Sequence, residues 1–258
     1  MRQVSFLPLS HVTAQMVDFS RLICNNRNIL VTFAPPTALQ QSLVDTFKEV
    51  RPTELMAVPR VYEKLEESVK SSFNLSTPMT KAFLNWARQR GLDNTDAQMS
   101  GERSPFGFNL ARVVILDKIK KNLGLDRVDK LYYGAAPMKK DTSEYFASLN
   151  MPITSIYGLS ETTGAATYQE FPNIKFAQNG PPLPGVHIKI FNPDDKGTGE
   201  ICIKGRNVFM GYLKRELLNQ ESFDGEGYFH TGDEGYLDEE GCLQITGRIK
   251  DIIITAGG

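Results

Sequence analysis

The sequence predicts an α/β fold, with a mostly parallel sheet covered by helices and, after it, a smaller β-rich subdomain of antiparallel strands. Over the first 160 residues, short apolar runs alternate with segments whose apolar residues recur every three or four positions. This order is typical of parallel strands joined by helices. After about residue 180, short alternating runs separated by Gly and Asp turns take over, which indicates antiparallel pairing.

The first elements follow this scheme in order. Residues 2–7 predict a strand, and the apolar residues between Leu9 and Leu22 then share one helix face. Residues 28–34 predict a second strand. Thr37 is the expected N-cap of a helix that ends at Pro52. The residues expected to face inward from that helix are Leu39, Leu43, Phe47 and Val50.

The strand and helix pattern then repeats. Residues 54–58 predict a strand, and Pro59 is placed to start a helix that buries Val61, Leu65 and Val69. Residues 91–107 are polar and rich in turn formers, so they are interpreted as a surface excursion between two helices. The further elements expected before residue 160 are a helix over 108–119, a strand at 131–133, a helix around 145–149 and a strand at 153–157.

The β-rich part is expected to begin near Pro184. Its predicted strands cover residues 186–191, 200–204, 235–237 and 242–246, with a further strand at 249–255. We therefore expect residues 1–183 to form an α/β part and residues 184–247 a β-rich subdomain. Residues 248–258 are expected to form a hinge.

Composition narrows the classes of function. The chain has 258 residues, of which 41% are hydrophobic, and a net charge of −1, so no bulk positive field exists to hold nucleic acid. Cys24, Cys202 and Cys242 lack paired metal-ligand spacing, which fits a reducing compartment and predicts no zinc site. No apolar run approaches the ~18 residues needed to cross a bilayer. A cytoplasmic protein, or one peripheral to a membrane, is expected.

Two strand-to-loop exits are candidate ligand sites, because helix N-termini and backbone N–H groups gather at such exits. In YYGAAPM (residues 132–138), small residues would let a flat ligand lie against backbone, although a tight turn has the same pattern. In YGLSETTG (residues 157–164), a ring, hydroxyls and a carboxylate could serve a base, phosphates and a hard cation. A turn capped by Ser160 or Thr162, with Glu161 in its first turn, is the competing interpretation.

Two further clusters lie in the β-rich part. YFHTGD (residues 228–233) holds a carboxylate suited to accept hydrogen bonds from the paired hydroxyls of a ribose. An Asx-type hairpin turn would have the same residues. GRIKD (residues 247–251) presents Arg248 and Lys250 at alternate positions, and such exposed charges are more often simply solvated.

In this order, the four clusters resemble those of AMP-forming acyl-CoA synthetases, in the adenylate-forming superfamily shared with luciferases and peptide-synthetase adenylation domains. Within that superfamily, the chain from Ser5 to Gly258 resembles the bubblegum-type long-chain fatty acid CoA ligases. The resemblance implies that these residues are part of the N-terminal domain of an adenylate-forming enzyme. The stretches that carry it are SFLPLSHVTAQ, LMAVPRVYEKLEE, YYGAAPM, YGLSETTG, GEICIKGRNVFMGYL, YFHTGD and GRIKDIIITAGG.

The resemblance implies a two-step reaction. The enzyme joins the carboxylate of a long-chain fatty acid to the α-phosphate of ATP, releasing pyrophosphate, and then transfers the acyl group to the thiol of coenzyme A. The carboxylate is a weak nucleophile that the polyphosphate repels. Mg²⁺ and fixed donors must therefore neutralise the charge that develops on phosphorus.

The same resemblance assigns the catalytic positions. Glu161 is expected to hold Mg²⁺, Ser160 to donate to the α-phosphate, and His11 to orient the acyl carboxylate. Tyr157 is expected to stack on adenine, opposite a bare wall formed by Gly134, Ala135, Ala136 and Pro137. 

The remaining positions serve the sugar and the second step. Asp233 is expected to accept from the ribose hydroxyls, and Arg248 to contact the same sugar. Asp251 matches the hinge of the family, and Gly257 and Gly258 match a loop beside the coenzyme A path.

Two pieces of the family pattern are absent from these residues: the Ser/Thr/Gly-rich phosphate loop and the C-terminal domain with its lysine. We therefore expect a portion of a ligase that is weakly active or inactive alone. Two alternatives stay open: a truncated isoform that binds AMP or acyl-adenylate without turnover, and an adenylating enzyme with another acceptor. An apolar substrate makes peripheral contact with the endoplasmic reticulum or another internal membrane reasonable.

Overall fold

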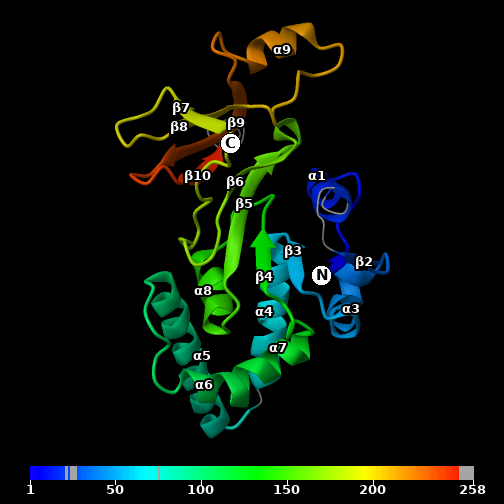
Figure 1. Ribbon diagram of the computed structural model, residues 1–258, viewed down its shortest axis with the longest axis vertical. Helices are drawn as coiled ribbons and strands as arrows, with labels where there is room; N and C mark the ends of the chain where they lie inside the picture. Colours follow the sequence, from blue (N-terminus) through cyan, green and yellow to red (C-terminus); the bar gives the residue numbers. More distant parts are fainter. Residues whose placement is uncertain (21–22, 24–27, 75, 250–258) are drawn as a thin grey trace, which may run out of the picture. The chain divides into compact units, whose positions relative to one another are not determined.

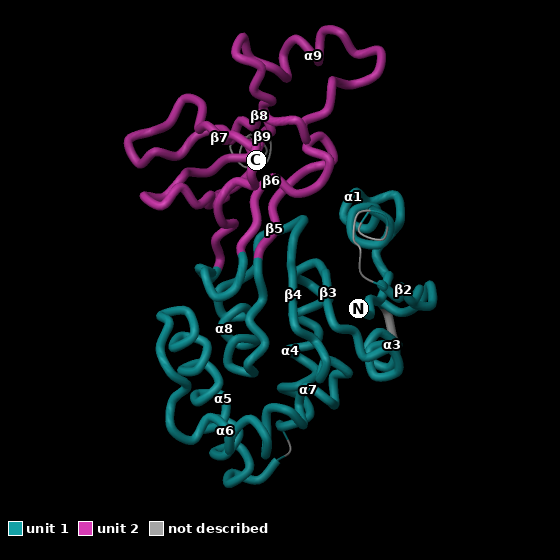
Figure 2. Tube along the Cα trace, viewed as in Figure 1, with its two compact units in different colours: residues 1–154, 170–176 teal, residues 155–169, 177–258 magenta. Residues whose placement is uncertain are grey.

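The structure is a computed structural model that describes residues 1–20, 23, 28–74 and 76–249 (Figure 1). The chain divides into two compact units (Figure 2). Unit 1 comprises Met1–Thr154 and Glu170–Phe176, and unit 2 comprises Ser155–Gln169 and Ala177–Gly258. The chain passes between the two units three times, and the first of these boundaries falls within the strand β5 (Ile153–Leu159). The expected domain division at residues 183 and 184 and the hinge over 248–258 stay predictions.

Unit 1 carries the strand and helix alternation that the sequence predicts. β1 and β2 pair in parallel, as do β3 and β4, and β5 is the next strand beside β4. The elements in chain order are β1 (Arg2–Ser5), α1 (Val12–Ala14), η1 (Gln15–Ser20), β2 (Leu30–Phe33), η2 (Ala38–Ser42), α3 (Leu43–Val50), β3 (Glu54–Ala57), α4 (Pro59–Asn74), α5 (Pro78–Met99), α6 (Phe108–Ala111), η3 (Arg112–Leu116), α7 (Asp117–Leu123), β4 (Lys130–Tyr133) and α8 (Lys140–Ser148).

The core of unit 1 lies between these strands and the apolar helix faces. Val61, Leu65 and Val69 of α4 are buried as their spacing predicts. The Tyr62 hydroxyl, on the same helix, donates to the carbonyl oxygen of Tyr132 at 2.7 Å. Because a buried polar group needs a partner, this bond fixes α4 against the strand that leads into the YYGAAPM segment.

Two expectations about helices in unit 1 are wrong. Thr37 makes no side-chain cap hydrogen bond, and Leu39 is 39% exposed instead of facing the core. The reason is that η2 is a π-helical segment, whose wider turn shifts the face that a regular α-helix would present.

The polar segment expected to be a surface excursion is helical as far as Met99. The Thr95 hydroxyl is fully buried and lies 3.1 Å from the carbonyl oxygen of Ala147 in α8. A Cβ atom on Gly91 would lie 2.0 Å from the carbonyl oxygen of Ser148. Small and hydrogen-bonding residues therefore let α5 approach α8 closely, and only the residues after Met99 form the loop.

Unit 2 contains the antiparallel sheet that the sequence predicts, with the strand order β10-β9-β8-β7. β6 pairs antiparallel with β5. Neither β6 nor α9 is predicted from the sequence. Besides β5, the elements are η4 (Ser160–Thr162), β6 (Gly164–Tyr168), β7 (Val186–Phe191), β8 (Gly199–Gly205), α9 (Glu216–Ser222), β9 (Phe229–Leu237) and β10 (Leu243–Arg248).

β9 is longer than expected, because it begins at Phe229 rather than at Gly235. The YFHTGD segment is therefore mostly strand and not the expected turn. Gly232, at φ +72°, interrupts the regular strand. The register of β9 with β8 shifts opposite Glu200 and Cys202, which is the signature of a β-bulge, and a bulge accommodates a residue in this conformation. The expected terminal strand at 249–255 lies outside the described residues from position 250 onward.

No helix among the described residues is both long enough and apolar enough to cross a bilayer.

Candidate functional site

Unit 2 contains a cavity of about 470 Å³ that is lined in part by residues of the antiparallel sheet. Six elements, β5, η4, β8, α9, β9 and β10, and the connection between β8 and α9 contribute to its wall. The residues of the wall include Glu161, Glu200, Tyr212, His230, Thr231 and Arg248. Several of the motifs that the sequence singles out therefore meet at one cavity.

The YGLSETTG turn reaches the cavity through its short helix η4. The buried Thr162 hydroxyl accepts from the backbone N–H of Leu159 at 2.8 Å and lies 2.7 Å from the carbonyl oxygen of Gly164. Thr162 thus closes the turn, as the structural interpretation of the motif allows. Ser160 is not the cap, since the helix follows Leu159, and its side chain is exposed.

Glu161 brings a negative charge to the cavity. Its Oε1 accepts a hydrogen bond from the Tyr212 hydroxyl at 2.9 Å. Burial of the phenol, together with this neighbouring carboxylate, raises the pKa of Tyr212 to about 12. The Tyr212 phenol therefore remains a neutral donor that orients Glu161 at physiological pH.

A buried carboxylate lies beside the cavity wall. Asp233 is 5% exposed, and its Oδ2 accepts from the Tyr157 hydroxyl at 2.8 Å. Its Oδ1 accepts from Nε of Arg248 at 2.9 Å. Burial, with the Asp233 charge, raises the pKa of the Tyr157 phenol well above its usual range. β5, β9 and β10 are thereby joined at one carboxylate.

Hydrogen bonds with Glu200, Ile201 and Thr231 fix the chain just before Asp233. The Gly232 N–H donates to Oε1 of Glu200 at 3.0 Å. The Thr231 hydroxyl donates to the carbonyl oxygen of Ile201 at 2.7 Å and accepts from the Asp233 N–H at 3.0 Å. Glu200 and Thr231 lie in stretches that the sequence singles out, but their roles as positioning residues were not predicted, because their partners lie about 30 positions away.

The remaining predicted positions lie in unit 1 or beyond the described part. His11 caps α1, since its Nδ1 accepts from the Thr13 N–H at 3.1 Å. In a neutral imidazole the proton is then on the exposed Nε2. Gly134 is buried, whereas residues 135–137 are exposed. 

Ala135, within this exposed stretch, has φ +68°, a conformation that costs a non-glycine residue energy and that clusters at functional sites. The predicted meeting of residues 134–137 with Tyr157 around one ligand stays a prediction, because the two segments belong to different units. Asp251, Gly257 and Gly258 lie outside the described residues.

Comparisons with known proteins agree with the expected resemblance. The family described as AMP-binding enzyme matches residues 1–213. The long-chain-fatty-acid–CoA ligase ACSBG2 of Gallus gallus is 43% identical over 256 residues, which cover 99% of this chain and 33% of that protein. The long-chain-fatty-acid–CoA ligase ACSBG1 of Bos taurus is 43% identical over 255 residues, which cover 99% of this chain and 35% of that protein. The chain thus spans about a third of the length of these curated relatives.

Solved structures support the fold. The O-succinylbenzoate coenzyme A synthetase MenE of Bacillus subtilis, in complex with ATP and magnesium ion, is 23% identical with a TM-score of 0.63. The similarity covers 100% of this chain and 43% of that chain. At this identity it shows the fold alone, and it confirms the expected α/β class with its β-rich part.

Replacing Thr162 by Val tests the role of the buried hydroxyl. The substitution conserves shape but leaves the Leu159 N–H without its acceptor, so we expect a loss of about 1–3 kcal/mol of stability. The measurement is the thermal unfolding midpoint of unit 2, followed by near-ultraviolet circular dichroism. Thr162→Ser retains the oxygen and is expected to unfold near the wild-type midpoint. A midpoint unchanged in Thr162→Val would contradict the structural role.

Proposed function

This chain belongs to the AMP-binding enzyme family, and we propose that it forms the nucleotide-binding portion of a long-chain fatty acid CoA ligase. The ligase would join a fatty acid to the AMP moiety of ATP, release pyrophosphate and transfer the acyl group to coenzyme A. The identity of 43% to ligases with that substrate name supports the choice of substrate. We also propose that the protein is cytoplasmic and makes peripheral contact with an internal membrane, because its acyl substrate would be dissolved in lipid.

The observation that carries the proposal is the carboxylate of Asp233, which directly follows Gly232 of the cavity wall and is paired with Arg248 of the same wall. A carboxylate has about four lone-pair sites, and the Tyr157 and Arg248 bonds occupy two of them. Asp233 can therefore accept from two neighbouring ribose hydroxyls without losing its present partners. Arg248 has a side chain that is 60% exposed, so it can also contact the sugar while it is paired with Asp233.

Tyr157 and residues 134–137 are each proposed to contact adenine. Exposed small side chains at 135 and 136 leave the backbone accessible to a flat base. Tyr157 packs in the apolar cluster of unit 2 with Ile201 and Leu243 and is 7% exposed. Stacking therefore requires that one face of this ring become accessible when the nucleotide binds.

The phosphates are proposed to meet Glu161 and Ser160. Mg²⁺ is commonly bound by one or two carboxylates together with phosphate oxygens and waters. The half-buried carboxylate of Glu161 on a cavity of about 470 Å³ fits that donor set. When bound there, Mg²⁺ would neutralise phosphate charge, and the exposed Ser160 hydroxyl would donate to the α-phosphate. The magnesium and ATP in the similar MenE structure support this pairing.

The acyl group and coenzyme A are assigned to the other predicted positions. We propose that His11 presents its Nε2–H to the acyl carboxylate, because its Nδ1 is engaged by the Thr13 N–H. Asp251 is proposed as the hinge, and Gly257 and Gly258 as the residues that leave room for the pantetheine arm of coenzyme A.

Replacing Asp233 by Asn tests the ribose position. We expect AMP affinity, measured by isothermal titration calorimetry, to fall about tenfold or more, since hydrogen bonds to a charged group contribute about 1.5–3 kcal/mol. Glu239→Gln makes the same change of charge at an exposed position before β10 and should leave the affinity unaltered. Undiminished AMP binding by folded Asp233→Asn would remove this residue from the site.

Replacing Glu161 by Gln tests the magnesium position. Affinity for Mg²⁺-ATP should fall about tenfold, a change of about 1.4 kcal/mol, while AMP measured without Mg²⁺ should bind as before, because the carboxylate serves the metal. Glu221→Gln removes another carboxylate of the same cavity and is the control. Equal losses for the two nucleotides would contradict the metal role.

Isotope exchange between pyrophosphate and ATP tests the substrate class. We expect the whole protein encoded by the gene to catalyse exchange with palmitate and not with amino acids or aryl acids. Exchange that depends on an amino acid would indicate an adenylating enzyme with another acceptor. AMP binding with no exchange for any acid would favour the nucleotide-binding alternative without turnover.

A further inference from the structure

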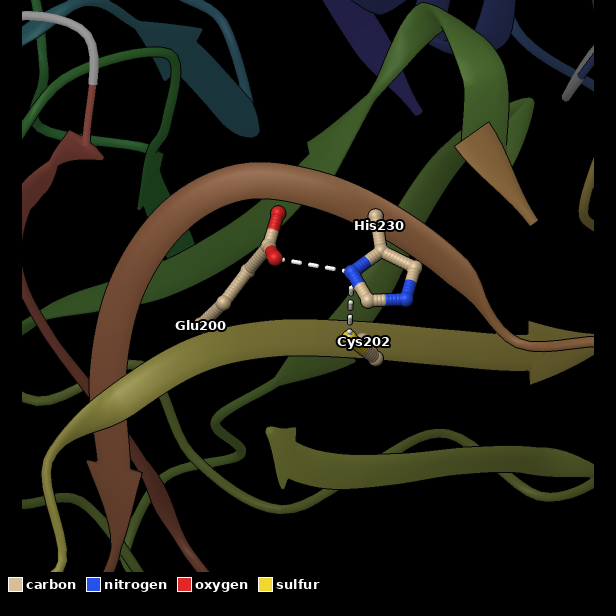
Figure 3. Close-up of side chains that lie close together, drawn as sticks. All are labelled: Glu200, Cys202 and His230. Atoms are coloured by element: carbon tan, nitrogen blue, oxygen red, sulfur yellow. Dashed lines mark hydrogen bonds and ion pairs between the residues drawn. The ribbon is translucent and has the colours of Figure 1, made fainter. Parts of the chain in front are cut away.

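We propose that Glu200, Cys202 and His230 form a binding site for a divalent cation of the Zn²⁺ class. One ligand atom from each of the three residues lies within 4.8 Å of the others. Figure 3 shows the three side chains pointing toward one another from neighbouring strands. This inference does not depend on the proposed ligase activity.

The strand framework explains why the three side chains meet. Glu200 and Cys202 lie two positions apart on β8, and residues with this spacing point to the same face of a sheet. His230 of β9 is the cross-strand partner of Cys202. The register between the two strands shifts at this point, so that Thr231–Asp233 of β9 lie opposite Ile201 alone; the β-bulge is therefore on β9 and begins directly after His230.

The arrangement differs from that of a catalytic triad. Nδ1 of His230 lies 2.7 Å from Oε2 of Glu200 and 3.4 Å from Sγ of Cys202. A base that activates a thiol is oriented by an acid on its other ring nitrogen, whereas here both partners face the same nitrogen.

The distances suit a tetrahedral ion after small adjustments. With metal-ligand bonds of about 2.0–2.3 Å, the donors around Zn²⁺ lie about 3.3–3.8 Å apart. The separation of the Cys202 and His230 donors is already 3.4 Å. The Glu200 and His230 atoms, at 2.7 Å, need to separate by less than about 1 Å when a cation replaces the shared proton.

The chemistry of the donors and their surroundings favours Zn²⁺ over Mg²⁺. Thiolate, imidazole and carboxylate together form a typical set of zinc ligands, whereas Mg²⁺ prefers oxygen donors alone. Cys202 is fully buried, while Glu200 and His230 line the cavity, so water can supply a fourth ligand. The nearby Lys189 on β7 does not oppose a cation, because its ammonium is paired with Asp224 at 2.6 Å.

Contacts with a backbone N–H and an aromatic ring hold two of the three proposed ligands. Oε1 of Glu200 accepts from the Gly232 N–H at 3.0 Å, which leaves Oε2 directed at the cluster. The ring of Phe191 packs edge-to-face on His230, with centroids 5.0 Å apart. Such contacts orient metal ligands and raise the affinity of a site. The sequence predicts no zinc site, because its cysteines lack the paired spacing of common metal-binding motifs. Ligands that are neighbours across two strands do not require such spacing along the chain.

Titration with Co²⁺ tests the site. The reduced, metal-free chain without an affinity tag is expected to bind one equivalent and to develop the thiolate-to-cobalt charge-transfer absorption, which Zn²⁺ then removes. Cys202→Ala and His230→Gln should each lose this absorption. Cys242→Ser changes another free cysteine of the same unit and should retain it. The absence of the band, or a band that persists in both cluster variants, would overturn the proposal.

A second measurement uses the unaltered protein, so it tests the site even if the Cys202 and His230 variants do not fold. Zn²⁺ at one equivalent should slow the alkylation of Cys202, followed by mass spectrometry of the peptides, at least tenfold relative to the metal-free protein. Cys242 should react at the same rate with and without Zn²⁺. Equal rates for Cys202 in the two conditions would count decisively against the site.

Discussion

The candidate site depends on one buried carboxylate and its two partners. Asp233 is 5% exposed, and an isolated ionised group at that depth would be strongly destabilising. The phenol of Tyr157 and the guanidinium of Arg248 satisfy its two oxygens. These three residues come from three different strands, so the interaction that permits the buried charge also fixes how β5, β9 and β10 meet.

The neighbouring strand β8 completes this frame. Glu200 holds the Gly232 peptide, and the Ile201 carbonyl accepts from the Thr231 hydroxyl. Both contacts lie immediately before Asp233, where the left-handed Gly232 interrupts the regular strand. The carboxylate is therefore positioned by backbone groups as well as by its own hydrogen bonds. Precise placement of this kind is what a binding group needs, because errors of about 1 Å already weaken function severely.

Much of the fold follows from patterns that are local in the sequence. The spacing of Val61, Leu65 and Val69 predicts the buried face of α4, and the alternating runs after residue 180 predict the antiparallel sheet. The last turns of α5 were not predicted, because the buried residues there, at 91, 94, 95 and 97, are glycine, asparagine, threonine and alanine, which carry little apolar signal. Their burial depends on α8, about 50 residues away, and a local pattern contains no information on that contact.

The same limit applies to the site. The motifs locate Tyr157, Glu161, Asp233 and Arg248 in the sequence, and the family resemblance supplies their expected roles. The bond between Tyr157 and Asp233 joins residues 76 positions apart, and the bond between Tyr212 and Glu161 joins residues 51 apart. Only the folded chain shows these partners. The two interpretations of YGLSETTG are not exclusive, because Thr162 serves the turn and leaves Ser160 and Glu161 available.

The cap at the start of α1 has a consequence for the charge state of His11. Its Nδ1 accepts from the Thr13 N–H, and an imidazolium has no lone pair left to accept a hydrogen bond. Protonation of this nitrogen would therefore break the cap hydrogen bond and leave the Thr13 N–H to another acceptor. If this residue meets an anionic substrate while the cap is in place, it does so as a neutral donor, and its orientation rather than its charge is what the polypeptide supplies.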